Sequence, residues 1–185
     1  IKNMAQVAEY QGKITPDQFA PLLYKIATEY NDALLIIENN SLGIGVLSRL
    51  QEMEYKNLYY SVKSTHEYVD ELTAQSIGAV PGFTMSMKTR PLVIAKLEEF
   101  VRNKLIKIKS ARLVNEIKTF VWHNGRPQAM RSYNDDLVIA ACISCWVRDT
   151  ALVTNSREME YKKALLSSIT TSQKTLNTKI PGQHG

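Results

Sequence analysis

The chain has 185 residues, of which 44% are hydrophobic, and a formal net charge of +5. This size and composition exclude a disordered chain and indicate one globular domain with a core of its own. The excess of positive charge suits a polyanionic partner but is too small to establish one.

The sequence lacks several signals. No apolar run reaches the roughly 20 residues of a membrane helix, and the first residues form no signal peptide, so we expect no membrane partner and a reducing cytoplasm. Cys142 and Cys145 have C-x-x-C spacing inside an apolar stretch, and we interpret them as core thiols. No phosphate-binding G-x-x-x-x-G-K-[ST] loop is present.

The chain begins with a predicted strand and helix. Residues 4–10 alternate apolar and polar side chains, which is typical of a strand. Thr15, Pro16 and Gln18 then supply an N-cap, a first-turn proline and a capping-box glutamine. Helical spacing of apolar residues continues to Asn31.

The next stretch combines an apolar run with an acid. Residues 33–38 are apolar until Glu38, a pattern that predicts a strand buried on both faces, with Glu38 at its carboxyl end. Open α/β sheets place their sites at that edge, although a glutamate there is often only solvated. Residues 39–43 form a turn into a helix over 44–53.

The middle of the chain is less regular. Residues 58–62 predict a short strand, a long polar stretch runs on to Lys88, and residues 80–83 predict a turn within it. A helix follows, with a proline in its first turn. Its expected buried stripe consists of Leu92, Val93, Leu97, Phe100 and Val101.

A hairpin precedes the most apolar part of the chain. Residues 105–109 alternate as a half-exposed strand, and Ser110 caps a short helix. Strands at 120–122 and 128–130 are expected to pair across a turn that contains Asn124-Gly125, the strongest short hairpin signal.

Two adjacent carboxylates open the apolar run at 133–147. We expect a helix there, buried on most faces, with Asn134 as its N-cap and Asp135 and Asp136 in its first turn. A last helix is predicted over 156–169. We therefore divide the chain into an α/β domain at 1–170 and a flexible tail at 171–185.

Three acids are the candidate site. If Glu38, Asp135 and Asp136 meet at the carboxyl edge of one sheet, they form an all-oxygen site suited to magnesium or manganese. Two such ions can activate a water and stabilise the leaving oxygen of a phosphodiester. The alternative is that both aspartates only open a helix. The three histidines, His66, His123 and His184, show no ligand spacing.

The order of these motifs resembles a known family. The segment at 35–43, an apolar strand followed by glutamate, asparagines and glycine, is similar to the nuclease domain of the large terminase subunit of tailed bacteriophages. The Asp-Asp-Leu-Val run at 135–138 is similar to that family's signature, which usually has histidine where Asn134 stands. The resemblance covers most of residues 5–150.

The resemblance implies a ribonuclease H-like fold, a mixed sheet flanked by helices. It also implies a two-metal endodeoxyribonuclease, using magnesium or manganese, that cuts concatemeric double-stranded DNA during viral genome packaging. The implied partners are the terminase ATPase domain, the portal and the small terminase subunit, in the cytoplasm of an infected bacterial host.

Roles follow by matching motifs. Glu38 corresponds to the middle metal ligand, Asp136 to the last, and Asp135 to an auxiliary ligand or orienting group. Lys88 and Arg90 are candidate contacts to DNA phosphates, with solvated side chains as the alternative.

The family's first catalytic aspartate has no counterpart. Asp17 lies at a predicted helix start and Asp32 at the base of a predicted strand, so neither fits. We therefore expect the first central strand and its aspartate to precede residue 1, and the chain as given to cleave DNA weakly or not at all. We expect the sheet to be rearranged, or the gap to be filled by the tail or by a second chain; the last of these would form a dimer through exposed sheet edges.

Two alternatives remain open. One is another ribonuclease H-like nuclease of the resolvase or transposase type. The other is a non-catalytic module that binds DNA or a portal.

Overall fold

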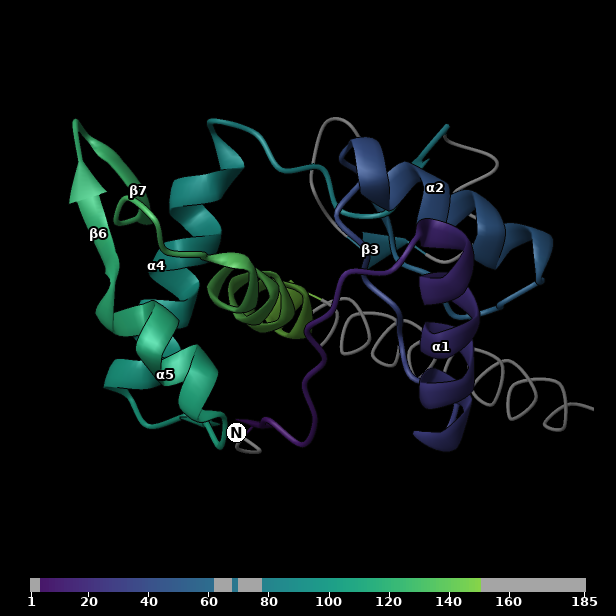
Figure 1. Ribbon diagram of the computed structural model, residues 1–185, viewed down its shortest axis with the longest axis horizontal. Coiled ribbons are helices and arrows are strands. Elements are labelled where there is room, and N and C mark those ends of the chain that lie inside the picture. Colours follow the sequence, from purple (N-terminus) through teal and green to yellow (C-terminus); the bar gives the residue numbers. More distant parts are fainter. Residues whose placement is uncertain (1–3, 62–67, 70–77, 151–185) are drawn as a thin grey trace, which may run out of the picture.

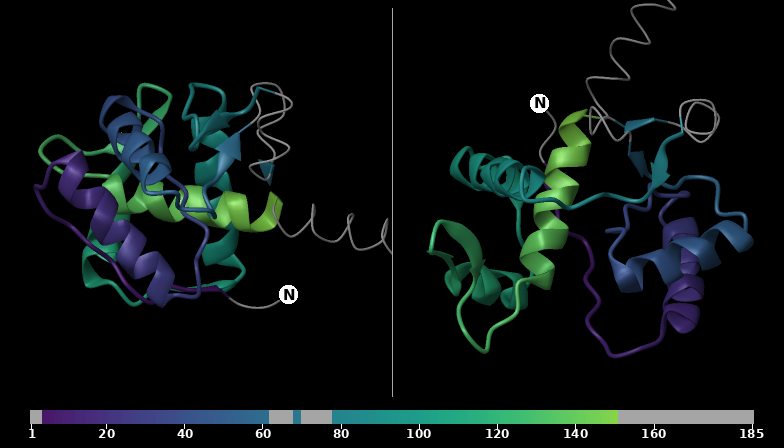
Figure 2. Two further views of the ribbon diagram at one scale, coloured as in Figure 1. Left: turned by 90° about the vertical axis from the view of Figure 1, so that its right-hand side faces the viewer. Right: turned by 90° about the horizontal axis from the view of Figure 1, so that it is seen from above.

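The computed structural model describes residues 4–61, 68–69 and 78–150. These residues form a mixed α/β structure in which a helix at 136–150 lies between two groups of elements. One group contains α1 and α2, and the other contains α4, α5 and the β6–β7 hairpin (Figure 1). The right-hand view of Figure 2 shows the central helix lengthwise between them.

Helix α1 (Pro16–Glu29) begins as the capping signals predict. The Gln18 side chain accepts a hydrogen bond from the Thr15 backbone N–H at 3.4 Å. The helix ends two residues before Asn31, because Asn31 and Asp32 adopt left-handed φ angles of 61° and 52°.

Helix α2 (Ser41–Glu52) packs against α1 and begins three residues earlier than expected. Its N-cap is Asn40, whose side-chain oxygen accepts from the Gly43 N–H at 2.8 Å. The two helices share a small hydrophobic core with the segment that follows them. Its buried members are Ala20, Ala27, Val46, Leu50, Tyr55, Leu58 and Tyr60.

The segment at 33–38 is extended but is not the doubly buried strand that its sequence predicts. Within the described residues it makes two isolated parallel bridges, Leu35 to Leu58 and Glu38 to Phe83, and its side chains are half-buried. Backbone bonds lie on one side of the segment, at residues 35, 37 and 39. Among the described residues no backbone group pairs with Ile36, so the other side completes no ladder.

A three-stranded antiparallel sheet has the order β3–β2–β4, formed by β2 (Tyr60–Ser61), β3 (Tyr68–Val69) and β4 (Val80–Pro81). The predicted turn at 80–83 is therefore wrong in its first half, because Val80 and Pro81 pair with β2. The predicted strand at 58–62 is shorter than expected, since its regular pairing covers only β2.

Helix α4 (Thr89–Arg102) supplies one side of the main core. Val93, Leu97 and Phe100 are buried as predicted, but Leu92 and Val101 are 51% and 46% exposed. The buried hydrophobic stripe of α4 is thus narrower than the sequence indicates, because its buried hydrophobic residues lie at the i, i+4 and i+7 positions 93, 97 and 100.

The chain then forms two short pairings around helix α5 (Ala111–Lys118). Strand β5 (Ile106–Lys107) pairs in parallel with β1 (Met4–Ala5), so both predicted strands exist but are only two residues long. As predicted, the Ser110 hydroxyl caps α5 by accepting from Leu113 N–H at 2.9 Å.

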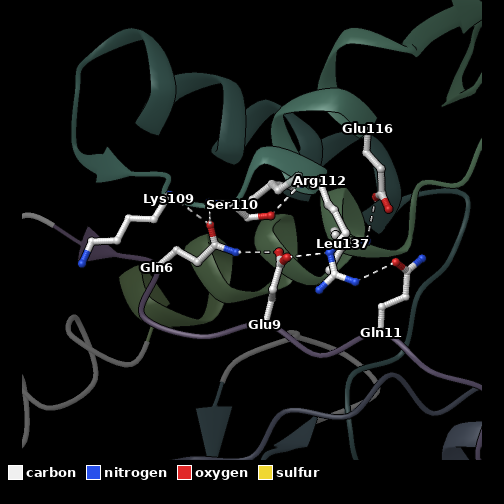
Figure 3. A network of polar contacts seen from close by, with 9 residues as sticks. Gln6, Glu9, Gln11, Lys109, Ser110, Arg112, Glu116 and Leu137 are labelled. Carbon is white, nitrogen blue, oxygen red and sulfur yellow. Dashed lines mark hydrogen bonds and ion pairs between the residues drawn. The ribbon is translucent and has the colours of Figure 1, made fainter.

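A side-chain network ends the β1–β5 pairing (Figure 3). The Gln6 amide oxygen accepts from the backbone N–H groups of Lys109 and Ser110, at 3.2 and 3.0 Å. Beyond Gln6, the Arg112 side chain on α5 donates to the Glu9 carboxylate at 2.7 Å. These side-chain bonds replace the backbone ladder and fasten the N-terminal segment to α5.

The predicted hairpin is confirmed. Strands β6 (Phe120–His123) and β7 (Arg126–Ala129) pair antiparallel over four residues each. Asn124 and Gly125 have φ angles of 50° and 73°, the left-handed pair that a tight two-residue turn requires.

The helix at 136–150 is the centre of the larger core, as the apolar run predicts. Its buried residues pack against Phe100, Leu113, Phe83 and Tyr59, and they are Val138, Ile139, Cys142, Ile143, Cys145 and Val147. The predicted helix at 156–169 and the tail at 171–185 lie outside the described residues.

The strands therefore form three small sheets within the described part of the chain, and none of these has more than three strands. The α/β class is confirmed, whereas the single mixed sheet is not seen there. The pairings of β1 with β5 and of β2 with β3 and β4 are each two residues long, so few backbone hydrogen bonds between strands join these segments.

Candidate active site

The backbone at Glu38 is held from two directions. On the strand side, Phe83 N–H donates to the Ile37 carbonyl at 2.7 Å, and Asn39 N–H donates to the Phe83 carbonyl at 3.0 Å. The Asn39 side chain also donates to the Thr84 hydroxyl at 2.8 Å. Glu38 thus stands at the end of an anchored extended segment.

On the helix side, Gly43 in the first turn of α2 lies against the carbonyl of Glu38. A Cβ atom at position 43 would overlap the Glu38 carbonyl oxygen. Only glycine permits this close approach of the helix to the extended segment. The location of the Glu38 carboxylate therefore depends on a residue that has no side chain.

The aspartate pair opens the central helix one residue later than expected. The Asp135 carbonyl accepts the first helical hydrogen bond, from Ile139 N–H at 2.8 Å, so Asp135 occupies the N-cap position predicted for Asn134. Asp135 is half-buried and Asp136 is exposed.

The carboxylate that caps this helix comes from elsewhere. One oxygen of Glu116, on α5, accepts from the backbone N–H groups of Leu137 and Val138 at 2.8 and 3.2 Å (Figure 3). Sequence reasoning did not identify Glu116, because it lies 21 residues before Leu137 and no local pattern links them. Because Glu116 accepts these N–H groups at the start of the helix, the side chains of Asp135 and Asp136 are not needed as acceptors for them.

The three predicted acids line one cavity of about 260 Å³. Glu38 enters it from the extended segment, Arg90 from α4, and Asp135 and Asp136 from the start of the central helix. Apolar and small side chains form the remaining wall: Ile36, Ile139, Ala140, Ile143 and Ser144. Segments about 50 and 45 residues apart in sequence thus contribute charged groups to one space.

Arg90 is already engaged in this cavity. Its Nη2 donates to Asp135 Oδ2 at 2.6 Å, and its Nε donates to the Pro127 carbonyl in β7 at 3.3 Å. Lys88, the other predicted phosphate contact, is an exposed residue just before α4 and is not part of the cavity lining.

The charges of the cavity act on Glu38. Burial is the main cause that raises the pKa of the Glu38 carboxyl, and repulsion from Asp135 and Asp136 raises it further, while the Arg90 guanidinium opposes both. Within the described part of the chain, no hydrogen-bond donor contacts the carboxylate of Glu38 or of Asp136. Among the described residues, Arg90 is the one group that partly offsets the charge of Glu38, and it does so without a hydrogen bond to that carboxylate.

The donor chemistry fits a hard divalent ion only in part. Carboxylate oxygens are suitable ligands for magnesium or manganese. However, no three acidic, histidine or cysteine side chains of the described residues are close enough together to hold a metal ion. Since Asp135 pairs with Arg90, Glu38 and Asp136 are the residues that would hold such an ion.

Residues set aside by the sequence analysis lie away from the cavity. Cys142 and Cys145 are free and fully buried, and burial raises the pKa of each thiol to about 12, as expected for core residues. Asp17 and Asp32 do not line the cavity. His123 is exposed at the end of β6, and His66 and His184 lie outside the described residues.

No helix in the described residues is long and apolar enough to cross a membrane. The sequence matches no protein-family model and no curated protein.

Proposed function

We propose that the chain belongs to a metal-dependent endonuclease that cuts double-stranded DNA, with Glu38 and Asp136 as metal ligands and a ribonuclease H-like fold. The observation that carries the proposal is that Glu38 and the aspartate pair, about 100 residues apart in sequence, line one cavity. Asp135 accepts from Arg90, whereas Glu38 has no hydrogen-bond donor among the described residues and is repelled by both aspartates.

A divalent ion would relieve that repulsion. Held by Glu38 and Asp136, magnesium or manganese would lower the pKa of a water and offset the charge on a phosphodiester. Arg90, at the cavity edge, would then be near enough to the substrate path to contact a phosphate. We propose the same setting for this activity as the motif resemblance does, the large terminase subunit of a tailed bacteriophage.

Two carboxylates hold a metal pair poorly, so the proposal needs a third acid besides Glu38 and Asp136. The described residues contain no group of three such side chains that could hold a metal ion. The activity test therefore uses the protein as its gene encodes it.

Nicking of supercoiled plasmid in manganese tests the proposal. We expect the protein as its gene encodes it to nick DNA, and Glu38→Gln and Asp136→Asn each to reduce the rate more than about 100-fold, because even the outer partners of a metal ligand contribute about 10- to 100-fold. Glu29→Gln and Asp17→Asn remove the same charges from α1, outside the cavity, and should leave the rate unchanged.

The opposite result has a defined meaning. If the protein as its gene encodes it binds DNA but nicks no plasmid, or if nicking survives Glu38→Gln, the nuclease proposal is wrong. The non-catalytic DNA- or portal-binding module would then be the better explanation of a cavity without a complete metal group.

A further inference from the structure

A second cavity adjoins the acidic one. It has a volume of about 480 Å³ and lies between residues 85–87 and 90–91, around the start of α4, and residues 125–128 of the β6–β7 hairpin. We call it the hairpin groove. Arg90 lines both cavities, so the two share a wall. In Figure 1 the tip of the hairpin and the start of α4 lie at the same edge of the molecule.

The hairpin groove differs from the acidic cavity in its charge. Among the described residues that line the groove none is acidic, and two, Arg90 and Arg126, are cationic. The stretches of sequence that meet there, 72–97 and 117–134, contain no aspartate or glutamate. Three carboxylates line the cavity beside it. Positive and negative side chains are thus separated into two adjoining spaces.

The cations of the groove differ in whether they already have partners. Arg90 donates to Asp135 and to the Pro127 carbonyl, so it ties β7 to the start of α4 and holds the two walls of the groove together. Arg126, in the groove, and Lys88, next to a lining residue in sequence, are exposed. Within the described part of the chain neither of these side chains has an ion pair or a hydrogen bond. Both are available to an anion.

We propose that the hairpin groove binds the phosphate backbone of double-stranded DNA through Arg126 and Lys88. The inference rests on the proposed function, from which it takes DNA as the ligand. Three carboxylates repel a polyanion, so a strand that is cut at the acidic cavity needs a cationic surface beside that cavity. The hairpin groove supplies this surface on the other side of Arg90. Contacts to phosphate oxygens position a duplex without reading its sequence.

The hairpin itself favours a duplex over an acidic protein segment as the ligand. Strands β6 and β7 form a two-stranded ribbon, and the major groove of DNA is wide enough to admit such a ribbon. Residues 121–126, at the tip, are all exposed, so no other described element covers the ribbon there. With the ribbon in the major groove, phosphates at the edge of that groove lie beside Arg126.

Binding of a fluorescein-labelled duplex to the 185-residue chain tests the proposal. Fluorescence anisotropy in metal-free buffer, over a series of salt concentrations, gives the affinity and its salt dependence. We expect Arg126→Gln to weaken binding about eightfold at about 0.1 M salt, because one fewer counterion is released from the DNA. The slope of log affinity against log salt should fall by about one, and Lys88→Gln should lower it by a similar amount.

Two control variants remove one positive charge outside the groove. Arg102 lies 12 residues after Arg90 on α4, or about 18 Å along the helix, which exceeds the screening length at about 0.1 M salt. Lys25 is an exposed residue of α1. Arg102→Gln and Lys25→Gln should each change the affinity less than about twofold and leave the slope unchanged. If Arg126→Gln behaves like these controls, the groove does not bind phosphate and the inference is wrong.

A crosslinking measurement covers the case in which Arg126→Gln fails to fold. Gln128→Cys places an accessible thiol in the groove, while Cys142 and Cys145 are fully buried and do not react with a photoactivatable thiol reagent. We expect this labelled variant to crosslink to the duplex. Gln51→Cys, at an exposed position of α2, should not. Failure of Gln128→Cys to crosslink, or equal crosslinking from Gln51→Cys, would overturn the proposal.

Competition with polyglutamate distinguishes DNA from an acidic protein segment. At equal total charge, unlabelled duplex should displace the labelled duplex at least about tenfold more effectively than polyglutamate does. If polyglutamate competes as well as DNA, the groove is a site for acidic protein segments, and its assignment to DNA is wrong.

The two proposals fail in different ways, because DNA binding is measured without metal. If Arg126→Gln weakens binding as expected but the protein as its gene encodes it nicks no plasmid, the hairpin groove is still a DNA-binding site and the nuclease proposal fails. If nicking depends on Glu38 while Arg126→Gln binds DNA like the wild type, the nuclease proposal holds and this inference fails.

Discussion

Glu116 and Glu38 both lie near the start of the central helix, but in contrasting surroundings. Glu116 accepts two backbone N–H bonds from Leu137 and Val138, so its charge is matched to the helix end. Glu38 faces two aspartates across the cavity, without a hydrogen-bond donor among the described residues. The same side chain therefore stabilises the fold in one place and is available for a ligand in the other.

The neighbourhood of Glu116 repeats this contrast. Glu9, in the network of Figure 3, contacts Arg112 and Gln6, and hydrogen bonds from Ser110 and Arg112 lower the pKa of its carboxyl. For Glu38 the pKa moves in the other direction. The two glutamates differ because Glu9 accepts hydrogen bonds from donors, whereas Glu38 is partly buried beside two aspartates.

The largest expected effect on stability concerns Glu116. Replacing it by alanine leaves two N–H groups of the helix start without their charged acceptor, and we expect the free energy of unfolding to fall by about 2 kcal/mol. Urea denaturation followed by circular dichroism measures this change. Glu29→Ala, at the exposed end of α1, is the control. If Glu116→Ala lowers the free energy of unfolding no more than Glu29→Ala does, Glu116 does not stabilise the helix start.

A smaller effect is expected at Gln6. Its amide oxygen accepts from two backbone groups, so Gln6→Ala should lower the free energy of unfolding by about 1 kcal/mol. Gln11→Ala is a matched control in the same segment, because Gln11 is exposed and accepts only from the Arg112 side chain. Equal losses for the two variants would mean that the network does not fasten the N-terminal segment as described.

The smallest expected effect is a gain in stability at Glu38. Because folding raises its pKa above the ordinary value of 4.5, the folded state favours the protonated form, and stability is lost as the pH rises through the folded pKa. Glu38→Gln removes this loss. The variant should match the wild type below pH 4.5 and be slightly more stable at neutral pH.

Unfolding measurements at both pH values, with Glu29→Gln as the control, check this sign. A difference between the wild type and Glu38→Gln that does not change with pH would show that the cavity imposes no charge penalty. Like that of Glu116, the charge of Glu38 would then cost the folded state no stability, and the contrast between the two glutamates would fail.

Local signals in the sequence predicted the local elements well. The Pro16 and Ser110 helix starts and the Asn124-Gly125 hairpin are confirmed, because each depends on hydrogen bonds or φ angles within a few residues. The apolar run at 136–147 is confirmed as the central helix for the same reason, since its own composition requires burial.

Features that depend on distant partners were predicted less well. Residues 33–38 read as a doubly buried strand, yet their pairing depends on which segments lie beside them. The cap of the central helix was assigned to Asn134, although the Glu116 carboxylate, from another helix, supplies it. Glu38 and the aspartates line one cavity, as expected, but they do not lie at the edge of one sheet in the described residues. The bond between Arg90 and Asp135 has no local signature in the sequence.

Gly43 gives the site a dependence that an inspection of charged residues misses. Helix α2 approaches the extended segment so closely that even a methyl group at position 43 would displace the Glu38 backbone. A variant such as Gly43→Ala therefore keeps every acid and every charge of the cavity and still moves one carboxylate away from the others. Natural or engineered changes that abolish ligand binding need not involve a single ionisable group.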